Sequence, residues 1–155
     1  MTIEEMMKKT GAKKKTVQTW LKNREIPGAE PLDDGTWDIP ESARRPYHPH
    51  CGAGSPPRAI HTSMVNACLK GCHFTYKTYG LSRDEFDACI GRLERADLLE
   101  VHLRDGIPYY DPTLKSMGMA KAPLAKLQTF VVRCLGEVAE RAACGVAKAY
   151  LDKIA

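Results

Sequence analysis

The strongest structural signal in the sequence is Thr16-Val17-Gln18-Thr19-Trp20-Leu21-Lys22, followed by Ile26-Pro27-Gly28-Ala29 and then by Gly35-Thr36-Trp37-Asp38-Ile39-Pro40. Its apolar residues Val17, Trp20 and Leu21 recur at helical spacing, which predicts a helix over residues 13–23 with one buried face. Pro27-Gly28 ends the helical pattern. Asp33-Asp34-Gly35 then predicts a turn between extended segments at 29–32 and 36–39.

A shorter helix is predicted upstream, over residues 3–9. Thr2 is its N-cap, and Glu5, three residues later, completes a capping box. Gly11 permits a sharp turn into the next helix. Two helices and a hairpin within about 40 residues form the smallest unit that presents a helix to the DNA major groove and supports it with a wing.

The outer face of the second predicted helix is polar and basic. Lysine contacts phosphates and a glutamine amide pairs with adenine edges, so this face is a candidate DNA reader. The lysines of this face could also be an ordinary solvated helix start. Positive charge at the start of a helix opposes the helix dipole, however, and this unfavourable placement favours an anionic partner for them. The candidate DNA-binding residues are Lys13, Lys14, Lys15, Thr16, Gln18, Thr19, Lys22 and Arg24.

A family resemblance rests on Val17-x-x-Trp20, Ile26-Pro27-Gly28-Ala29 and Trp37-x-Ile39-Pro40-x-x-Ala43. Together they resemble the small winged helix-turn-helix domains of the MerR superfamily, and most closely its excisionase-like branch from phages and other mobile elements. The resemblance covers about 45 of the 155 residues. It implies that the second helix reads DNA and that the hairpin is a wing on the DNA backbone. In this chain the wing tip is Asp33-Asp34, where a phosphate-binding wing carries Lys or Arg.

A linker and a second domain follow. Residues 46–57 contain four prolines and two glycines, through which neither helix nor strand persists. We therefore expect a DNA-binding domain at 1–46, a linker at 47–57 and a second domain at 58–118. In the second domain, a capping box at Ser82 and Glu85 starts a helix, and Arg104-Asp105-Gly106 turns a hairpin. This run resembles the winged-helix half of many bacterial regulators.

The second domain is expected to be a scaffold or a protein-binding module. Its second helix exposes both signs of charge, and the carboxylates of Asp84 and Asp87 repel phosphates. The aromatic residues and lysine near its connector suit a protein interface. The candidate protein-contact residues are Tyr76, Lys77, Tyr79 and Tyr109.

Residues 119–155 are predicted to form a dimerisation helix that begins at Pro123. A helix of some 30 residues is about 45 Å long, which is more than a 60-residue domain covers. A second copy of the same helix is the simplest partner for its apolar stripe, and folding back across the same chain is the alternative. The stripe consists of Leu124, Leu127, Val131, Leu135, Val138, Ala142, Val146 and Ala149.

Charge and cysteine content constrain the partners. The net charge is +4, and residues 1–58, 59–118 and 119–155 carry +2, −1 and +3. The six cysteines include two clusters, His48-Pro49-His50-Cys51 and Cys68-x-x-x-Cys72-His73. Neither cluster has the paired short spacing of a zinc site, although together they offer four ligands. We expect buried free thiols, with no metal and no cofactor.

The remaining signals exclude several classes. No apolar run reaches the length of a membrane span and no signal peptide opens the chain, so a cytoplasmic protein is expected. No phosphate loop, nucleophile elbow or His-Glu-x-x-His helix is present, so no enzyme is expected.

The sequence therefore predicts a mainly α protein with small β-hairpin wings, built from two tandem winged helix-turn-helix domains plus a long C-terminal helix. We expect a dimer that binds double-stranded DNA sequence-specifically, as a transcriptional regulator or an excisionase-like accessory factor of a prokaryotic mobile element. The alternative is a protein-binding antagonist, either an anti-repressor or a host-defence inhibitor, on the same scaffold.

Overall fold

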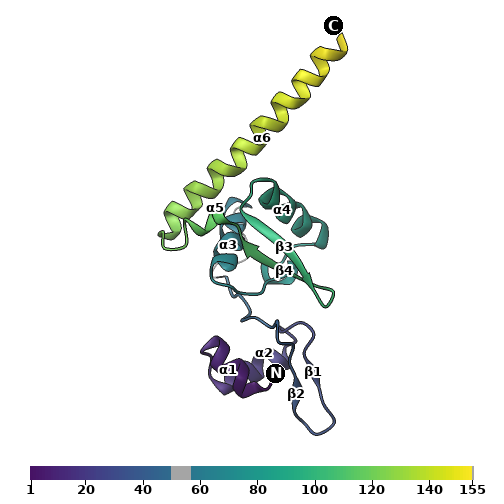
Figure 1. The fold of residues 1–155 in the computed structure, drawn as a ribbon, viewed down its shortest axis with the longest axis vertical. Helices are drawn as coiled ribbons and strands as arrows, with labels where there is room; N and C mark the ends of the chain where they lie inside the picture. The colour runs from purple at the N-terminus through teal and green to yellow at the C-terminus, as the bar shows by residue number, and fades with distance from the viewer. Residues whose placement is uncertain (50–56, 155) are drawn as a thin grey trace.

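A computed structural model describes residues 1–49 and 57–154, with side chains for 1–49 and 60–140. About half of the chain is helical, and two antiparallel two-stranded hairpins accompany the helices (Figure 1). In chain order the elements are α1 (Ile3–Thr10), α2 (Lys14–Lys22), β1 (Glu30–Pro31), β2 (Trp37–Asp38), α3 (Pro57–Leu69), the 3-10 helix η1 (Tyr76–Tyr79), α4 (Arg83–Arg95), β3 (Leu99–Arg104), β4 (Ile107–Pro112), α5 (Leu114–Met117) and α6 (Leu124–Ile154).

The first lobe, residues 1–46, is built on α1, α2 and the β1–β2 hairpin. The predicted capping box is confirmed: the Glu5 amide donates to Thr2 Oγ1 at 3.2 Å, and the Thr2 amide donates to Glu5 Oε2 at 2.7 Å. The strands are shorter than predicted, with two residue pairs in register, because the Ala29 amide just before β1 donates to the Ile26 carbonyl at 3.4 Å and not to the partner strand. The buried core of this lobe consists of Met6, Val17, Trp20, Leu21, Ile26, Ile39 and Ala43.

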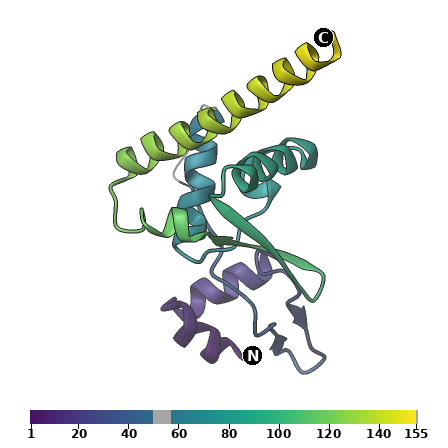
Figure 2. The ribbon, with the colours of Figure 1, turned by 45° about the horizontal axis from the view of Figure 1, so that its top comes forward.

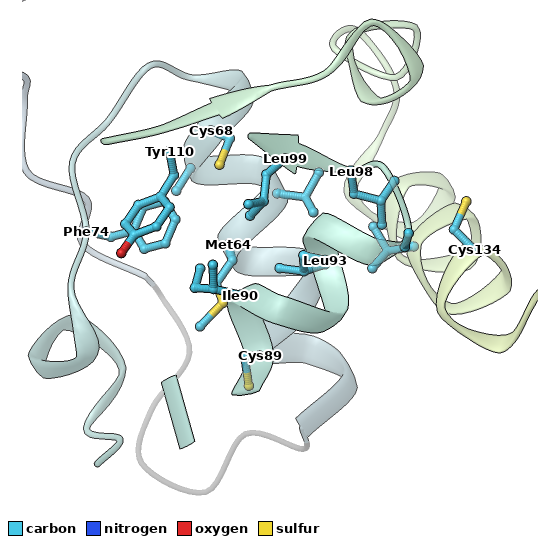
Figure 3. Close-up of a cluster of buried hydrophobic side chains, with 14 of the residues drawn as sticks. Met64, Cys68, Phe74, Cys89, Ile90, Leu93, Leu98, Leu99, Tyr110 and Cys134 are labelled. Carbon is cyan, nitrogen blue, oxygen red and sulfur yellow. The ribbon is translucent and has the colours of Figure 1, made fainter. Parts of the chain in front are cut away.

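The second lobe, residues 57–138, packs α3, α4, the β3–β4 hairpin and the first half of α6 around a larger core (Figure 3). The capping box predicted at Ser82 and Glu85 is confirmed. Six residue pairs join β3 to β4. Within the core the Phe74 and Tyr110 rings stack with centroids 4.8 Å apart, and Leu93 of α4 is fully buried.

Helix α6 packs on its own chain at one end. Leu127 and Val131 are buried in the second-lobe core, and Leu135 and Val138 pack against that core. This placement corrects the assignment of Leu127 and Val131 as dimerisation residues, because the core of the same chain already buries them. Leu124 is 60% exposed. The helix then continues beyond the second lobe (Figures 1 and 2). The side chains of Ala142, Val146 and Ala149 lie outside the described residues.

The two lobes meet along a joint that the sequence did not predict. The Tyr47 amide donates to the His73 carbonyl, and the His73 amide donates to the Arg45 carbonyl, each at 2.8 Å. Arg44 Nη2 lies 2.7 Å from Asp111 Oδ1. Tyr109 shares a hydrogen bond of 3.1 Å with Ser42 and is 1% exposed. Tyr109 is therefore corrected from a surface contact to a buried residue of this joint.

Candidate nucleic-acid interface

Helix α2 presents the predicted residues to solvent. Its apolar side, Val17, Trp20 and Leu21, is buried against α1 and the hairpin, as its spacing predicts. The opposite side is exposed along the whole helix, and Lys13 precedes it in the N-cap position. The exposed residues brought together here are Lys13, Lys14, Lys15, Thr16, Gln18, Thr19, Lys22 and Arg24.

The charge on this surface is largely uncompensated. The first turn of α2 has no acidic residue, and no side chain in the described part of the chain caps its amides. Lys14 Nζ approaches Glu4 Oε1 at 3.9 Å, a long contact between two exposed groups that contributes little. The Thr19 hydroxyl donates to the Lys15 carbonyl at 2.9 Å, so its oxygen remains available as an acceptor. The helix thus offers cations and an unengaged Gln18 amide on one face.

The β1–β2 hairpin has the opposite charge. Its acidic residues Glu30, Asp33, Asp34 and Asp38 are all exposed. Asp34 Oδ1 accepts hydrogen bonds from the Thr36 amide at 2.9 Å and from its hydroxyl at 2.5 Å, which lowers the pKa of that carboxyl. The hairpin therefore carries fixed negative charge that repels a phosphate backbone.

The connector of the second lobe is partly absorbed by its core. Tyr76 and Tyr79 pack against that core, and the Ser63 hydroxyl donates to the Tyr79 hydroxyl at 3.4 Å. The Arg83 guanidinium lies 5.2 Å from the Tyr76 ring centre. Lys77 is exposed. Of the four candidate protein-contact residues, Lys77 thus lies open on the surface and the three tyrosines are wholly or partly covered.

Cysteine and histidine residues form no metal cluster in the described part of the chain, where no group of three or more His, Cys, Asp or Glu side chains could hold an ion. Cys68, Cys72, Cys89 and Cys134 are buried free thiols, as predicted. Burial raises the pKa of Cys68 to about 12, which keeps it an unreactive thiol at neutral pH. The predicted cluster members His50 and Cys51 lie outside the described residues.

Comparison with protein-family models, with curated proteins and with solved structures finds no match to this chain. Across the described residues, no helix combines the length and the apolar character that a membrane span requires.

Sequence reasoning missed the basic residues next to the joint. Lys9, Arg45 and Lys70 lie around one groove although they come from three separate segments. The tandem Arg44-Arg45 was the available signal. The two arginines have different environments, because Arg44 pairs with Asp111 inside the joint and Arg45 is exposed. No local pattern specifies that difference.

Proposed function

We propose that the protein is a sequence-specific DNA-binding protein whose α2 enters the major groove. The observation that supports this most directly is the exposed face of α2, where Gln18 and Thr19 lie between Lys14, Lys15 and Lys22. Amide and hydroxyl groups read base edges while the surrounding lysines contact phosphates. The order α1, α2 and hairpin, with α2 packed on its inner side, suits a winged helix-turn-helix, and the second lobe repeats that order with α3, α4 and β3–β4.

We extend this proposal to a homodimer in which the distal half of α6 pairs with its copy. The helix runs from Leu124 to Ile154, and Leu127 and Val131 in its first half are already buried in the second lobe. Two copies related by a two-fold axis would place two α2 helices on a palindromic site. This arrangement suits a transcriptional regulator or an excisionase-like accessory factor of a prokaryotic mobile element, acting in the cytoplasm without a cofactor.

The test is selection of bound duplexes from a randomised pool, followed by sequencing. A conserved motif, two-fold symmetric if the dimer forms, is the expected result. Enrichment of no motif after repeated rounds would contradict sequence-specific binding. A Gln18→Ala protein selected in parallel should lose preference at one base position and keep the rest of the motif.

The acidic hairpin supports a second candidate function, a protein-binding antagonist. Its four exposed carboxylates flank Leu32, which is 48% exposed, and such a surface is complementary to a basic protein partner. Reversing the charge of the hairpin distinguishes the two candidate functions. An antagonist would lose activity in cells when Asp33 and Asp34 become lysines, whereas a DNA-binding protein would gain affinity for duplex DNA.

A further inference from the structure

A groove about 640 Å³ in volume runs along the joint between the lobes, and its walls are strongly basic. The first lobe contributes Lys9 at the end of α1, together with Arg44 and Arg45. The second lobe contributes Lys70, which directly follows α3. The lining of this groove, as far as the structure describes it, includes no aspartate or glutamate.

Three of these cations keep their charge unneutralised. The Lys9 ammonium donates to the Glu41 backbone carbonyl at 2.6 Å, which holds the side chain in place without cancelling its charge. Arg45 and Lys70 are exposed, and no described carboxylate pairs with either of them. Both line the same groove as Cys72. Burial raises the pKa of the Cys72 thiol, and the positive charges of Arg45 and Lys70 offset part of that rise.

The groove adjoins the exposed face of α2. His48 lines the groove and also lines a neighbouring hollow formed by Lys13, Lys15, Thr16 and Thr19. Glu25 lines that hollow too, and its carboxylate lies 3.1 Å from His48 Nε2 and accepts from Asn23 Nδ2 at the same distance. The hollow beside Lys13 and Lys15 and the groove of the joint therefore meet at His48.

A protein that inserts a helix in the major groove needs flanking phosphate contacts to fix the register of that helix. The β1–β2 hairpin is unsuited to this task because Glu30, Asp33, Asp34 and Asp38 are exposed on it. We propose that the joint groove replaces the wing, so that Lys9, Arg45 and Lys70 hold the phosphate backbone of the duplex that α2 reads. This inference rests on the proposed DNA-binding function and assigns a direct DNA contact to the second lobe.

The experiment measures binding of the full chain to a mixed-sequence duplex of about three helical turns, by fluorescence anisotropy over a range of NaCl concentrations. The groove variant is Arg45→Ala with Lys70→Ala. Both side chains are exposed, so folding should persist. We expect the slope of log K against log salt to fall by about two and the affinity at moderate salt to fall at least about tenfold. The charge-preserving variant, Arg45→Lys with Lys70→Arg, should keep the slope.

Two matched variants separate the failure modes. The control replaces the exposed Lys121 and Lys126, which line no part of the groove, and should bind as the unaltered chain does. The α2 variant replaces Lys14 and Lys22. Loss of slope in the α2 variant, with the groove variant equal to the control, would overturn the groove inference and leave the proposed function standing. Absence of duplex binding by the unaltered chain would overturn both.

A second measurement distinguishes the DNA backbone from a free anion. The amide resonances of Lys70 and Gly71 should shift on adding duplex, and should not shift on adding inorganic phosphate at the same ionic strength. Saturable shifts with inorganic phosphate that duplex does not reproduce would overturn the inference, because the groove would then be a small-anion site.

Discussion

Arg44 Nη2 lies 2.7 Å from Asp111 Oδ1, and this ion pair ties the first lobe to strand β4 of the second. The two side chains are 15% and 27% exposed. The same guanidinium donates to the Tyr110 carbonyl at 3.3 Å and lies 5.0 Å from the centre of the Tyr109 ring. One side chain thus makes three kinds of contact across the joint.

The Arg44→Ala variant should lower the free energy of unfolding by about 1–3 kcal/mol, since it removes the closer charged contact of a carboxylate that is only 27% exposed. Asp111 would keep its longer contact with His102 Nε2, at 3.8 Å. Urea denaturation measures the loss in free energy. Trp20 and Trp37 report the first lobe by fluorescence, and circular dichroism reports all the helices. The unfolding transitions followed by fluorescence and by circular dichroism should have different urea midpoints in this variant. Arg92→Ala, at an exposed arginine of α4, is the control. If the losses in unfolding free energy from Arg44→Ala and Asp111→Ala simply add in the double variant, the two side chains are not coupled.

Acid should weaken the joint through His73. Among the described residues, neither ring nitrogen of this buried histidine has a hydrogen-bond partner. Burial, together with the nearby Arg44 charge, lowers its pKa to about 4 from the ordinary 6.5. Because the unfolded chain takes up this proton at higher pH, the His73 contribution to stability is complete above pH 6.5 and declines as pH falls toward 4. The loss near the lower end is about 3 kcal/mol.

The variant His73→Phe keeps an aromatic ring beside Tyr109 and cannot titrate. Its free energy of unfolding, measured in urea from pH 7 to pH 4.5, should decline less than that of the unaltered chain. Equal pH profiles for the two proteins would show that His73 does not carry the effect.

Substitutions on α2 should divide into two kinds. If α2 reads DNA as proposed, Gln18→Ala removes a base-edge contact and should relax base preference at one position by about 1–3 kcal/mol. Lys14→Ala and Lys22→Ala should each flatten the salt slope by about one and weaken all duplexes alike. Gln128→Ala and Lys126→Ala, at exposed positions of α6, are the matched controls for binding measured on selected and scrambled duplexes.

Dimerisation should reside beyond residue 140. A chain ending at Glu140 keeps the α6 residues that complete the second-lobe core, and we expect it to be monomeric while the full chain is a dimer. Analytical ultracentrifugation at micromolar concentration compares them. Val131→Asp does not test assembly, because it buries a charge in the core of the same chain and should unfold the second lobe. A monomeric full chain would refute the dimer proposal.

Structural features that depend on neighbouring residues could be predicted from the sequence. The capping boxes at Thr2 and Ser82 depend on residues three positions apart, and the apolar spacing of α2 depends on residues within about one turn of helix. Both were therefore predicted correctly. The short elements η1 and α5 were not predicted, since so few residues form no periodic pattern and tertiary contacts decide them.

The contacts between the two lobes could not be predicted from the sequence, because they link residues that lie far apart in it. Tyr109 and Tyr110 show the difficulty most clearly. Alternation along β4 places Tyr110 in the second-lobe core and Tyr109 against Ser42 and His73 of the joint. Successive side chains of a strand point to opposite faces, but the sequence does not say which part of the chain covers each face. The basic groove shares this origin, since three distant segments build it.

The contacts across the joint differ in what they demand of the sequence. The two bonds between residues 45–47 and His73 use backbone amides and carbonyls, so almost any residues could form them. The pair of Arg44 and Asp111 needs complementary side chains at both positions. A chimera that exchanged the first lobe for a related one would keep the backbone half of the connection automatically. It would keep the ion pair with Asp111 only if the new lobe also had an arginine at the position of Arg44. The two lobes are therefore partly but not freely interchangeable.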